Sequence, residues 1–126
     1  MSTSSTPVGA RFALVVDDNP SAGAISGALL EATGWKVDQA RDGFEAIVKF
    51  RSRNYDAVVL DYRLPGMDGV AVLDWMRRHL QECPEVVVVS SDCLNLLREK
   101  FGGLGVKAIL QKPVSATDLC QVLQAA

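Results

Sequence analysis

The sequence predicts an α/β fold, a three-layer sandwich in which helices cover both faces of a five-stranded parallel sheet. The first observation is a set of short apolar runs rich in Val and Ile, typical of strands buried on both faces of a parallel sheet. The second is that helical patterns separate these runs, so that strand and helix signals alternate five times along 126 residues. The connections are short, which favours right-handed crossovers between parallel strands.

The first two strand–helix pairs carry clear start and stop signals. Phe12 to Val16 is the first expected strand, followed by a helix from Pro20-Ser21 to Thr33. Proline suits the first turn of a helix, and Gly34 suits the position just past its end. The second expected strand covers Lys36 to Ala40, and Asp42 is placed to cap a helix that continues through Phe50.

The third pair contains a longer connection. Ala57 to Leu60 reads as a strand, and the loop from Asp61 to Met67 is punctuated by Pro65-Gly66. Asp68 then caps a helix whose apolar residues recur at helical spacing: Val72, Leu73 and Met76. Val86 to Val89 is the fourth expected strand.

The fourth helix has a weaker pattern than the others. One face carries Leu94, Leu97, Phe101 and Leu104, while Leu96 points the other way, which predicts an exposed leucine on a mobile helix. Three glycines, Gly102, Gly103 and Gly105, end this helix loosely. The fifth strand is Ala108 to Gln111, and the capping-box spacing of Ser115 and Asp118 opens a last helix that runs nearly to the C-terminus.

Composition excludes several classes of function. A net charge of -2 gives no electrostatic footprint for nucleic acid, and no apolar stretch approaches the ~20 residues needed to span a membrane. The three cysteines lack metal-binding spacing, which favours free thiols in a reducing cytoplasm. Residues 1–10 have no signal-peptide features and are expected to be a flexible leader to a single domain over residues 11–126.

Polar residues that suit phosphate or metal chemistry follow four of the expected strands: Asp17 and Asp18, Asp61, Ser90, and Lys112. Ligands of parallel sheets bind just beyond the carboxyl ends of the strands, so these groups are expected to meet at one edge. Crowded carboxylates need a cation, and a site with few oxygen ligands suits Mg²⁺. Helix capping by Asp18 and turn formation by Asp61 would explain each acid singly, but not their convergence.

Asp61 is the best candidate nucleophile because it follows the central third strand. A carboxylate can attack phosphorus to give an acyl phosphate, and phosphoryl transfer asks the protein mainly for positioning and charge neutralisation. Mg²⁺ and Lys112 would supply positive charge, while the hydroxyl of Ser90 could hydrogen-bond a phosphoryl oxygen.

Five segments carry a resemblance to a known family: VVDDNP (15–20), GWKVDQARDGFEAI (34–47), YDAVVLDYRLPGMDG (55–69), VVVVSSD (86–92) and QKP (111–113). The chain resembles a response-regulator receiver domain of the single-domain type, the phosphoacceptor half of a two-component system. The similarity covers about residues 11 to 126 with all spacings intact. It implies a flavodoxin-like strand order 2-1-3-4-5 and a cis bond between Lys112 and Pro113.

The resemblance also implies roles for individual residues. Asp61 would be the phosphorylated aspartate. Asp18 and Asp61 would bind Mg²⁺ (or Mn²⁺) directly, together with the backbone carbonyl of Arg63, and Asp17 would act through a water. Ser90 takes the position of the switch hydroxyl and Lys112 that of the lysine that contacts the phosphoryl group.

The same resemblance implies partners and setting. The phosphodonor would be a histidine kinase or a histidine phosphotransfer protein, and a downstream protein would bind the face formed by the fourth helix, fifth strand and fifth helix. The module would be a cytoplasmic, bacterial signalling protein, a monomer or weak dimer, and not a turnover enzyme. The initial Met and the leader favour a stand-alone regulator over a fragment of a larger regulator or hybrid kinase.

Two departures from the common pattern of the family bear on how the site would work. Ile109 stands where many receivers carry an aromatic residue that turns inward with the switch hydroxyl, and an isoleucine cannot make that movement. Arg63 and Asp92 occupy variable positions that influence how fast the acyl phosphate is lost. We hypothesise that their opposite charges pair over the site and hinder an attacking water, although two independent surface charges would be the simpler interpretation.

Three other functions are alternatives to a phosphorylated switch. An aspartate-nucleophile phosphatase would need a second acid two residues after Asp61, where this chain has Arg63. A flavodoxin-like FMN protein would need a phosphate-binding loop after the first strand, where DDNP repels phosphate. A pseudo-receiver that only binds partners would have no use for the full set of acids, Ser90 and Lys112.

Overall fold

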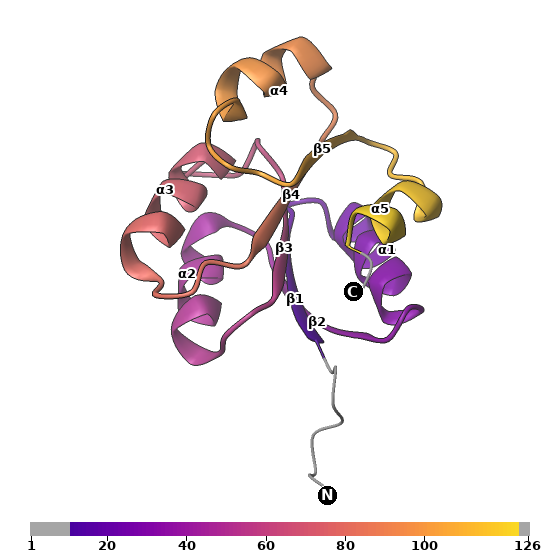
Figure 1. The fold of residues 1–126 in the computed structure, drawn as a ribbon, viewed down its shortest axis with the longest axis horizontal. Coiled ribbons are helices and arrows are strands. Elements are labelled where there is room, and N and C mark those ends of the chain that lie inside the picture. Colours follow the sequence, from indigo (N-terminus) through magenta and orange to yellow (C-terminus); the bar gives the residue numbers. More distant parts are fainter. Residues whose placement is uncertain (1–10, 124–126) are drawn as a thin grey trace, which may run out of the picture.

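The computed structural model describes residues 11–123 as a five-stranded parallel sheet with helices on both faces (Figure 1). The strands are β1 (Arg11–Val16), β2 (Trp35–Ala40), β3 (Ala57–Leu60), β4 (Glu85–Ser90) and β5 (Ala108–Gln111). The helices are α1 (Pro20–Glu31), α2 (Gly43–Ser52), α3 (Gly69–His79), α4 (Leu94–Phe101) and α5 (Ala116–Val122). The strand order β2-β1-β3-β4-β5 confirms the predicted flavodoxin-like fold.

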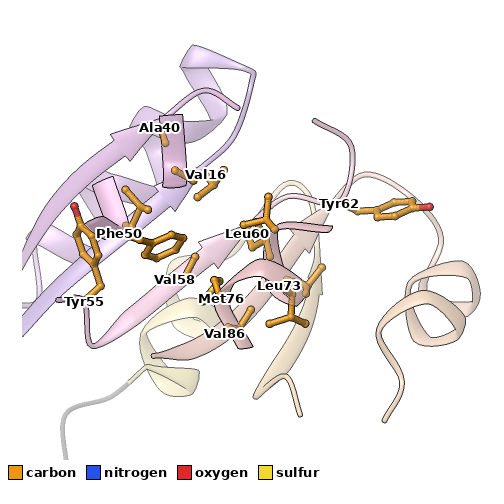
Figure 2. Close-up of a cluster of buried hydrophobic side chains, with 14 of the residues drawn as sticks. Val16, Ala40, Phe50, Tyr55, Val58, Leu60, Tyr62, Leu73, Met76 and Val86 are labelled. Carbon is orange, nitrogen blue, oxygen red and sulfur yellow. The ribbon is translucent and has the colours of Figure 1, made fainter. Parts of the chain in front are cut away.

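The sheet separates two hydrophobic clusters because successive residues of a strand point to opposite faces. In Figure 1, α1 and α5 lie together on one face of the sheet, and α2 and α3 lie on the other. The larger cluster packs α2, α3 and α4 against the sheet, and Figure 2 shows part of it around Leu60, Leu73 and Met76. The smaller cluster joins α1 and α5 to the opposite face through Leu30 and Leu119.

The parallel register sets the carboxyl ends of the central strands side by side. Val16 of β1 pairs with both Ala40 of β2 and Leu60 of β3, and Ser90 of β4 pairs with Gln111 of β5. The residues that follow these strands therefore emerge at the same edge of the sheet. This register is what positions the candidate site.

Side-chain caps fix where four of the helices begin. Asp42, Asp68 and Ser115 each accept a backbone N–H bond from the first turn of α2, α3 and α5, at 2.7 to 2.9 Å, which confirms the three predicted caps. Helix α1 begins after Asn19, whose side chain accepts two such bonds. Helix capping therefore does not explain Asp18.

Helix α4 differs from its predicted form in two ways. It ends at Phe101, so Leu104 lies outside the helix and is 40% exposed. The chain after it turns at Gly103 and Gly105, which have positive φ angles of 78° and 75°. Leu96 is half-buried against the larger cluster, so its predicted exposure is wrong; the buried stripe of a helix is at least 100° wide and takes in the neighbour of Leu97.

Two expectations concern residues outside the described range. The leader over residues 1–10 and the last three residues, 124–126, are not among residues 11–123.

Within that range no helix has both the length and the apolar character to cross a membrane. Helix α1 ends at Glu31, two residues before the predicted Thr33, and Gly34 follows with a φ of 97°.

Candidate functional site

Backbone hydrogen bonds bring the predicted site residues to one edge of the sheet. The N–H of Asp61 donates to the carbonyl of Val16 at 3.0 Å, and that of Lys112 donates to the carbonyl of Ser90 at 2.9 Å. The N–H of Asp17 makes the same kind of bond to β2. Each residue thus continues the strand ladder by one step, and its side chain emerges just beyond the strand end.

Three carboxylates converge at this edge. Asp17, Asp18 and Asp61 each place an oxygen within 4.8 Å of the others. Asp17 and Asp61 are buried, with 7% and 6% of their surface exposed, whereas Asp18 is exposed. Like charges this close are costly unless a cation or a proton compensates them, so the arrangement calls for positive charge.

Lys112 supplies positive charge to the two buried carboxylates. Its Nζ lies 2.7 Å from an oxygen of Asp17 and 2.9 Å from an oxygen of Asp61. The lysine directly follows β5, and its peptide bond to Pro113 is cis, as the resemblance implies. The ammonium group therefore bridges the acids of β1 and β3 at the centre of the site.

Burial and the contacts between Lys112 and the acids shift the pKa values of these groups in opposite directions. Burial raises the pKa of the Asp61 carboxyl above its ordinary value, and the charge of Asp17 adds to this, although the hydrogen bond and charge of Lys112 oppose it. Burial acts to lower the pKa of Lys112, but hydrogen bonds to Asp17 and Asp61 more than offset it, and the net pKa is raised. Lys112 thus stays protonated beside the two acids.

The loop between β3 and α3 forms one wall of the site. The N–H of Arg63 donates to an oxygen of Asp61 at 3.3 Å, which holds the start of the loop against the carboxylate. A shallow hollow of about 330 Å³ lies beside it, and its lining includes Asp18, Tyr62 and Asp68. The hollow is open to solvent, and its lining includes one member of the acidic cluster, Asp18.

Ser90, Asp92 and Arg63 form a hydrogen-bonded chain at the mouth of the site. The hydroxyl of Ser90 donates to Asp92 at 3.1 Å, and Nε of Arg63 donates to the same carboxylate at 3.0 and 3.2 Å. The Arg63–Asp92 pairing that the sequence suggested is therefore present. Ser90 itself is buried, and its hydroxyl is directed to Asp92.

The structure places Ile109 against the larger hydrophobic cluster and adds two residues that the sequence did not single out. Ile109 lies half-buried on β5 and packs against the larger cluster. Gln111 donates from Nε2 to the carbonyl of Asp92 at 2.9 Å, and Tyr62 is buried next to the site. The position of Tyr62 directly after Asp61 could have drawn notice, whereas the contact of Gln111 depends on the path of a loop.

A family model described as response regulator receiver domain matches residues 13–124. The chain is 41% identical over 104 residues, 79% of its length, to the gliding motility regulatory protein of Myxococcus xanthus, and matches 13% of that protein. It is 29% identical over 116 residues, 90% of its length, to the signal transduction histidine-protein kinase BarA of Escherichia coli strain K12, and matches 12% of it. The chain thus spans about an eighth of the length of each of these two relatives.

The fold has close counterparts among solved structures. The response regulator receiver domain (CheY-like) from Methylobacillus flagellatus superposes with a TM-score of 0.79 at 28% sequence identity, covering 91% of this chain and 97% of that one. With the strand order and the family match, this settles the family of the chain. It belongs to the response regulator receiver domains of two-component signalling.

Proposed function

We propose that this receiver domain accepts a phosphoryl group on Asp61 and changes its binding to a partner in response. The observation that carries the proposal is the buried carboxylate of Asp61 at the sheet edge, 2.9 Å from the ammonium of Lys112. Two further carboxylates lie beside it, which gives the site both a nucleophile and a place for a second cation.

The donor atoms of the site fit Mg²⁺ or Mn²⁺. Asp18 and Asp61 would bind the ion directly with the backbone carbonyl of Arg63, and Asp17 would act through a water. Three carboxylates that meet within 4.8 Å offer hard oxygen ligands, and Lys112 offers its single charge to only two of them. The bound ion would neutralise charge on the phosphoryl oxygens.

The transfer itself needs little from the protein beyond position and charge. An oxygen of Asp61 attacks phosphorus, the bond from phosphorus to the donor nitrogen breaks, and an acyl phosphate forms. Lys112 would then contact one phosphoryl oxygen from its place beside Asp61, and the hydroxyl of Ser90 would turn from Asp92 to another. The product would be an acyl phosphate on Asp61, at the edge of the sheet.

The Arg63–Asp92 pair would set how long the acyl phosphate lasts. It lies next to Asp61 through the backbone N–H of Arg63, and Asp92 also holds the hydroxyl of Ser90. A pair held across the mouth of the site hinders a water that approaches phosphorus in line with the breaking bond. We therefore assign these two residues a part in slowing dephosphorylation.

The donor would be a histidine kinase or a histidine phosphotransfer protein, and the setting the bacterial cytoplasm. The likeness to a protein named a histidine-protein kinase supports a partner of this class. The downstream partner would bind the face formed by α4, β5 and α5, and the domain would act as a monomer or weak dimer without turnover chemistry. Residues 1–10 would serve as a leader to this domain, which covers 11–126.

Intact mass tests the proposal. The protein is incubated with acetyl phosphate in the presence of Mg²⁺ or of EDTA, alongside Asp61→Asn and, as a control, Asp74→Asn on the exposed side of α3. We expect a gain of one phosphoryl group in the wild type and in the Asp74 variant with Mg²⁺, and none in Asp61→Asn or with EDTA. A wild type without any gain would favour a pseudo-receiver.

A further inference from the structure

Tyr62 joins the candidate site to helix α4 by an aromatic contact. It follows Asp61 directly and is 8% exposed, and its ring meets the ring of Phe101 edge to face with centroids 5.8 Å apart. Figure 2 shows the Tyr62 ring directed away from the side chains gathered around Leu73 and Met76, toward the neighbouring helix. Phe101 is fully buried on α4, so a movement of the Tyr62 ring acts on a packed contact of that helix.

The backbone of Tyr62 is fixed, so its ring is the part that can move. The N–H of Gly69 donates to the carbonyl of Tyr62 at 2.7 Å. A Cβ atom at Gly69 would lie 2.4 Å from the carbonyl oxygen of Asp61 and 3.0 Å from Cα of Tyr62, which shows how closely the loop closes on this segment. We therefore expect a change passed on by Tyr62 to come mainly through rotation of its side chain.

The other neighbour of the Tyr62 ring leads to the switch hydroxyl. The guanidinium of Arg63 lies 5.2 Å from the centre of the ring and is paired with Asp92. Asp92 in turn accepts the hydroxyl of Ser90. A continuous set of contacts thus runs from Ser90 through the Arg63–Asp92 pair to Tyr62, and from there to Phe101.

Helix α4 is held loosely enough to respond. Of its eight residues only Leu97 and Phe101 are buried, and the side chain of its N-cap residue, Cys93, makes no capping hydrogen bond. Loss of such a cap costs a helix about 1 kcal/mol. Ile109, in contrast, is half-buried and has no ring that could fill or leave a pocket as the hydroxyl moves.

We propose that Tyr62, through its contact with Phe101, carries the change at Asp61 to helix α4 in place of an aromatic residue at position 109. The proposal rests on the function proposed above and adds how the phosphorylated site is read out. When Ser90 turns its hydroxyl to a phosphoryl oxygen, Asp92 loses that donor and the Arg63–Asp92 pair is released from Ser90. The guanidinium beside Tyr62 then shifts, the ring rotates, and its contact with Phe101 changes.

Hydrogen exchange of the α4 amides tests the proposal on the full chain. Exchange over residues 94–101 is measured with and without acetyl phosphate and Mg²⁺, and intact mass reports phosphoryl uptake in the same samples. The variants are Tyr62→Leu, Tyr62→Phe as the matched control that keeps the ring, and Ile109→Ala. In the wild type, Tyr62→Phe and Ile109→Ala, we expect the exchange rate to change about two- to tenfold on phosphorylation, the range that one aromatic pair allows.

In Tyr62→Leu we expect phosphoryl uptake without this change in exchange. Uptake shows that the variant is folded at the site; should it fail to take up phosphate, Phe101→Leu removes the same ring contact from the other side. A full change in α4 exchange in whichever ring-deleted variant takes up phosphate would overturn the proposal. Loss of the exchange change in Ile109→Ala, with the change kept in the ring-deleted variant, would also overturn it. A wild type that gains no phosphoryl mass would instead overturn the proposed function, and this readout with it.

Discussion

Nε of Arg63 donates to both carboxylate oxygens of Asp92, at 3.0 and 3.2 Å, across the mouth of the site that contains Asp61. The arginine comes from the loop after β3 and the aspartate from the loop after β4, so the pair joins the two connections that flank the site. The guanidinium is largely exposed, whereas Asp92 is mostly covered. This arrangement is compatible with the proposed role of the pair in slowing dephosphorylation.

Removal of either partner of this pair is expected to shorten the life of the acyl phosphate. Exposed ion pairs typically contribute about 0.2–1 kcal/mol, so Arg63→Ala and Asp92→Ala should each lose the phosphoryl group about 1.4 to 5 times faster than the wild type. The decay of phosphorylated protein after removal of the donor measures this. Arg78→Ala, which breaks an exposed ion pair on α3, is the control; half-lives equal to that of the control would refute the role of the pair.

Lys112→Met is expected to destabilise the protein and to increase its response to Mg²⁺. Without the ammonium, the buried carboxylates of Asp17 and Asp61 face each other uncompensated, which should cost about 1–3 kcal/mol in the free energy of unfolding. A divalent ion replaces the missing charge, so it should stabilise the variant more than the wild type. Urea unfolding in EDTA and in Mg²⁺ gives both quantities, and equal stabilisation by Mg²⁺ would contradict this account.

Gly69→Ala should damage the site more than the same change at the matched position of α2. Gly43 and Gly69 are both the first residues of helices that follow an aspartate cap. A Cβ at Gly69 would meet the backbone of Asp61 and Tyr62, whereas one at Gly43 would meet the side chains of Met67 and Val72, which can move.

We expect Gly69→Ala to lower the free energy of unfolding by about 1–3 kcal/mol, as overpacking does, and to slow phosphoryl uptake. Gly43→Ala should cost less and leave uptake unchanged. Urea unfolding and the rate of mass gain with acetyl phosphate are the two measurements. If Gly69→Ala and Gly43→Ala lower the free energy of unfolding and the rate of phosphoryl uptake equally, the close approach of the backbone at Gly69 is not the cause of these losses.

Tyr55 is expected to make the protein sensitive to alkali. Burial raises the pKa of its hydroxyl, and the hydrogen bond at 2.7 Å to the carboxylate of Asp38 raises it further. The unfolded chain loses this proton near pH 10 while the folded chain keeps it, so the folded state binds more protons and stability falls as pH rises above about 10, by up to about 1.4 kcal/mol per pH unit. Tyr55→Phe removes this contribution.

The free energy of unfolding of the wild type should therefore fall more steeply than that of Tyr55→Phe between about pH 9 and pH 11. At neutral pH the variant should be less stable by about 1.5–3 kcal/mol, since it loses one hydrogen bond to a charged acceptor. Urea unfolding at a series of pH values checks both statements. Parallel curves for the two proteins would show that the Tyr55 hydroxyl ionises alike in the folded and unfolded states.

Most of the fold could be predicted because its signals are local. The strand ends before Asp17, Asp61 and Lys112 follow from short apolar runs, and an aspartate or serine side chain marks the start of α2, α3 and α5. Strand boundaries moved by one residue at most, because hydrogen-bonded ladders extend one step past the apolar run. The end of helix α4 and the burial of Leu96 were predicted less well. Three nearby glycines give no clear signal for the last residue of this helix, and its packing depends on the sheet edge.

The residues that meet at the site could be predicted better than the side-chain contacts between them. Asp17, Asp18 and Asp61 had to meet because parallel strands bring their carboxyl ends to one edge. The bridge from Lys112 to both Asp17 and Asp61 depends on side-chain conformation, and the contact between Tyr62 and Phe101 depends on how α4 is placed, neither of which local sequence specifies. The proposed readout through α4 therefore rests on a contact that the sequence alone does not predict.

The most direct test of this account is to locate the phosphoryl group on the chain. Borohydride reduces an acyl phosphate to an alcohol, so protein treated with acetyl phosphate and Mg²⁺, then with borohydride, carries homoserine at the phosphorylated aspartate. The account predicts this conversion at Asp61 alone, and no conversion when EDTA replaces Mg²⁺. Conversion at Asp17, Asp18 or another acid, or a phosphorylated chain with none at Asp61, would contradict it.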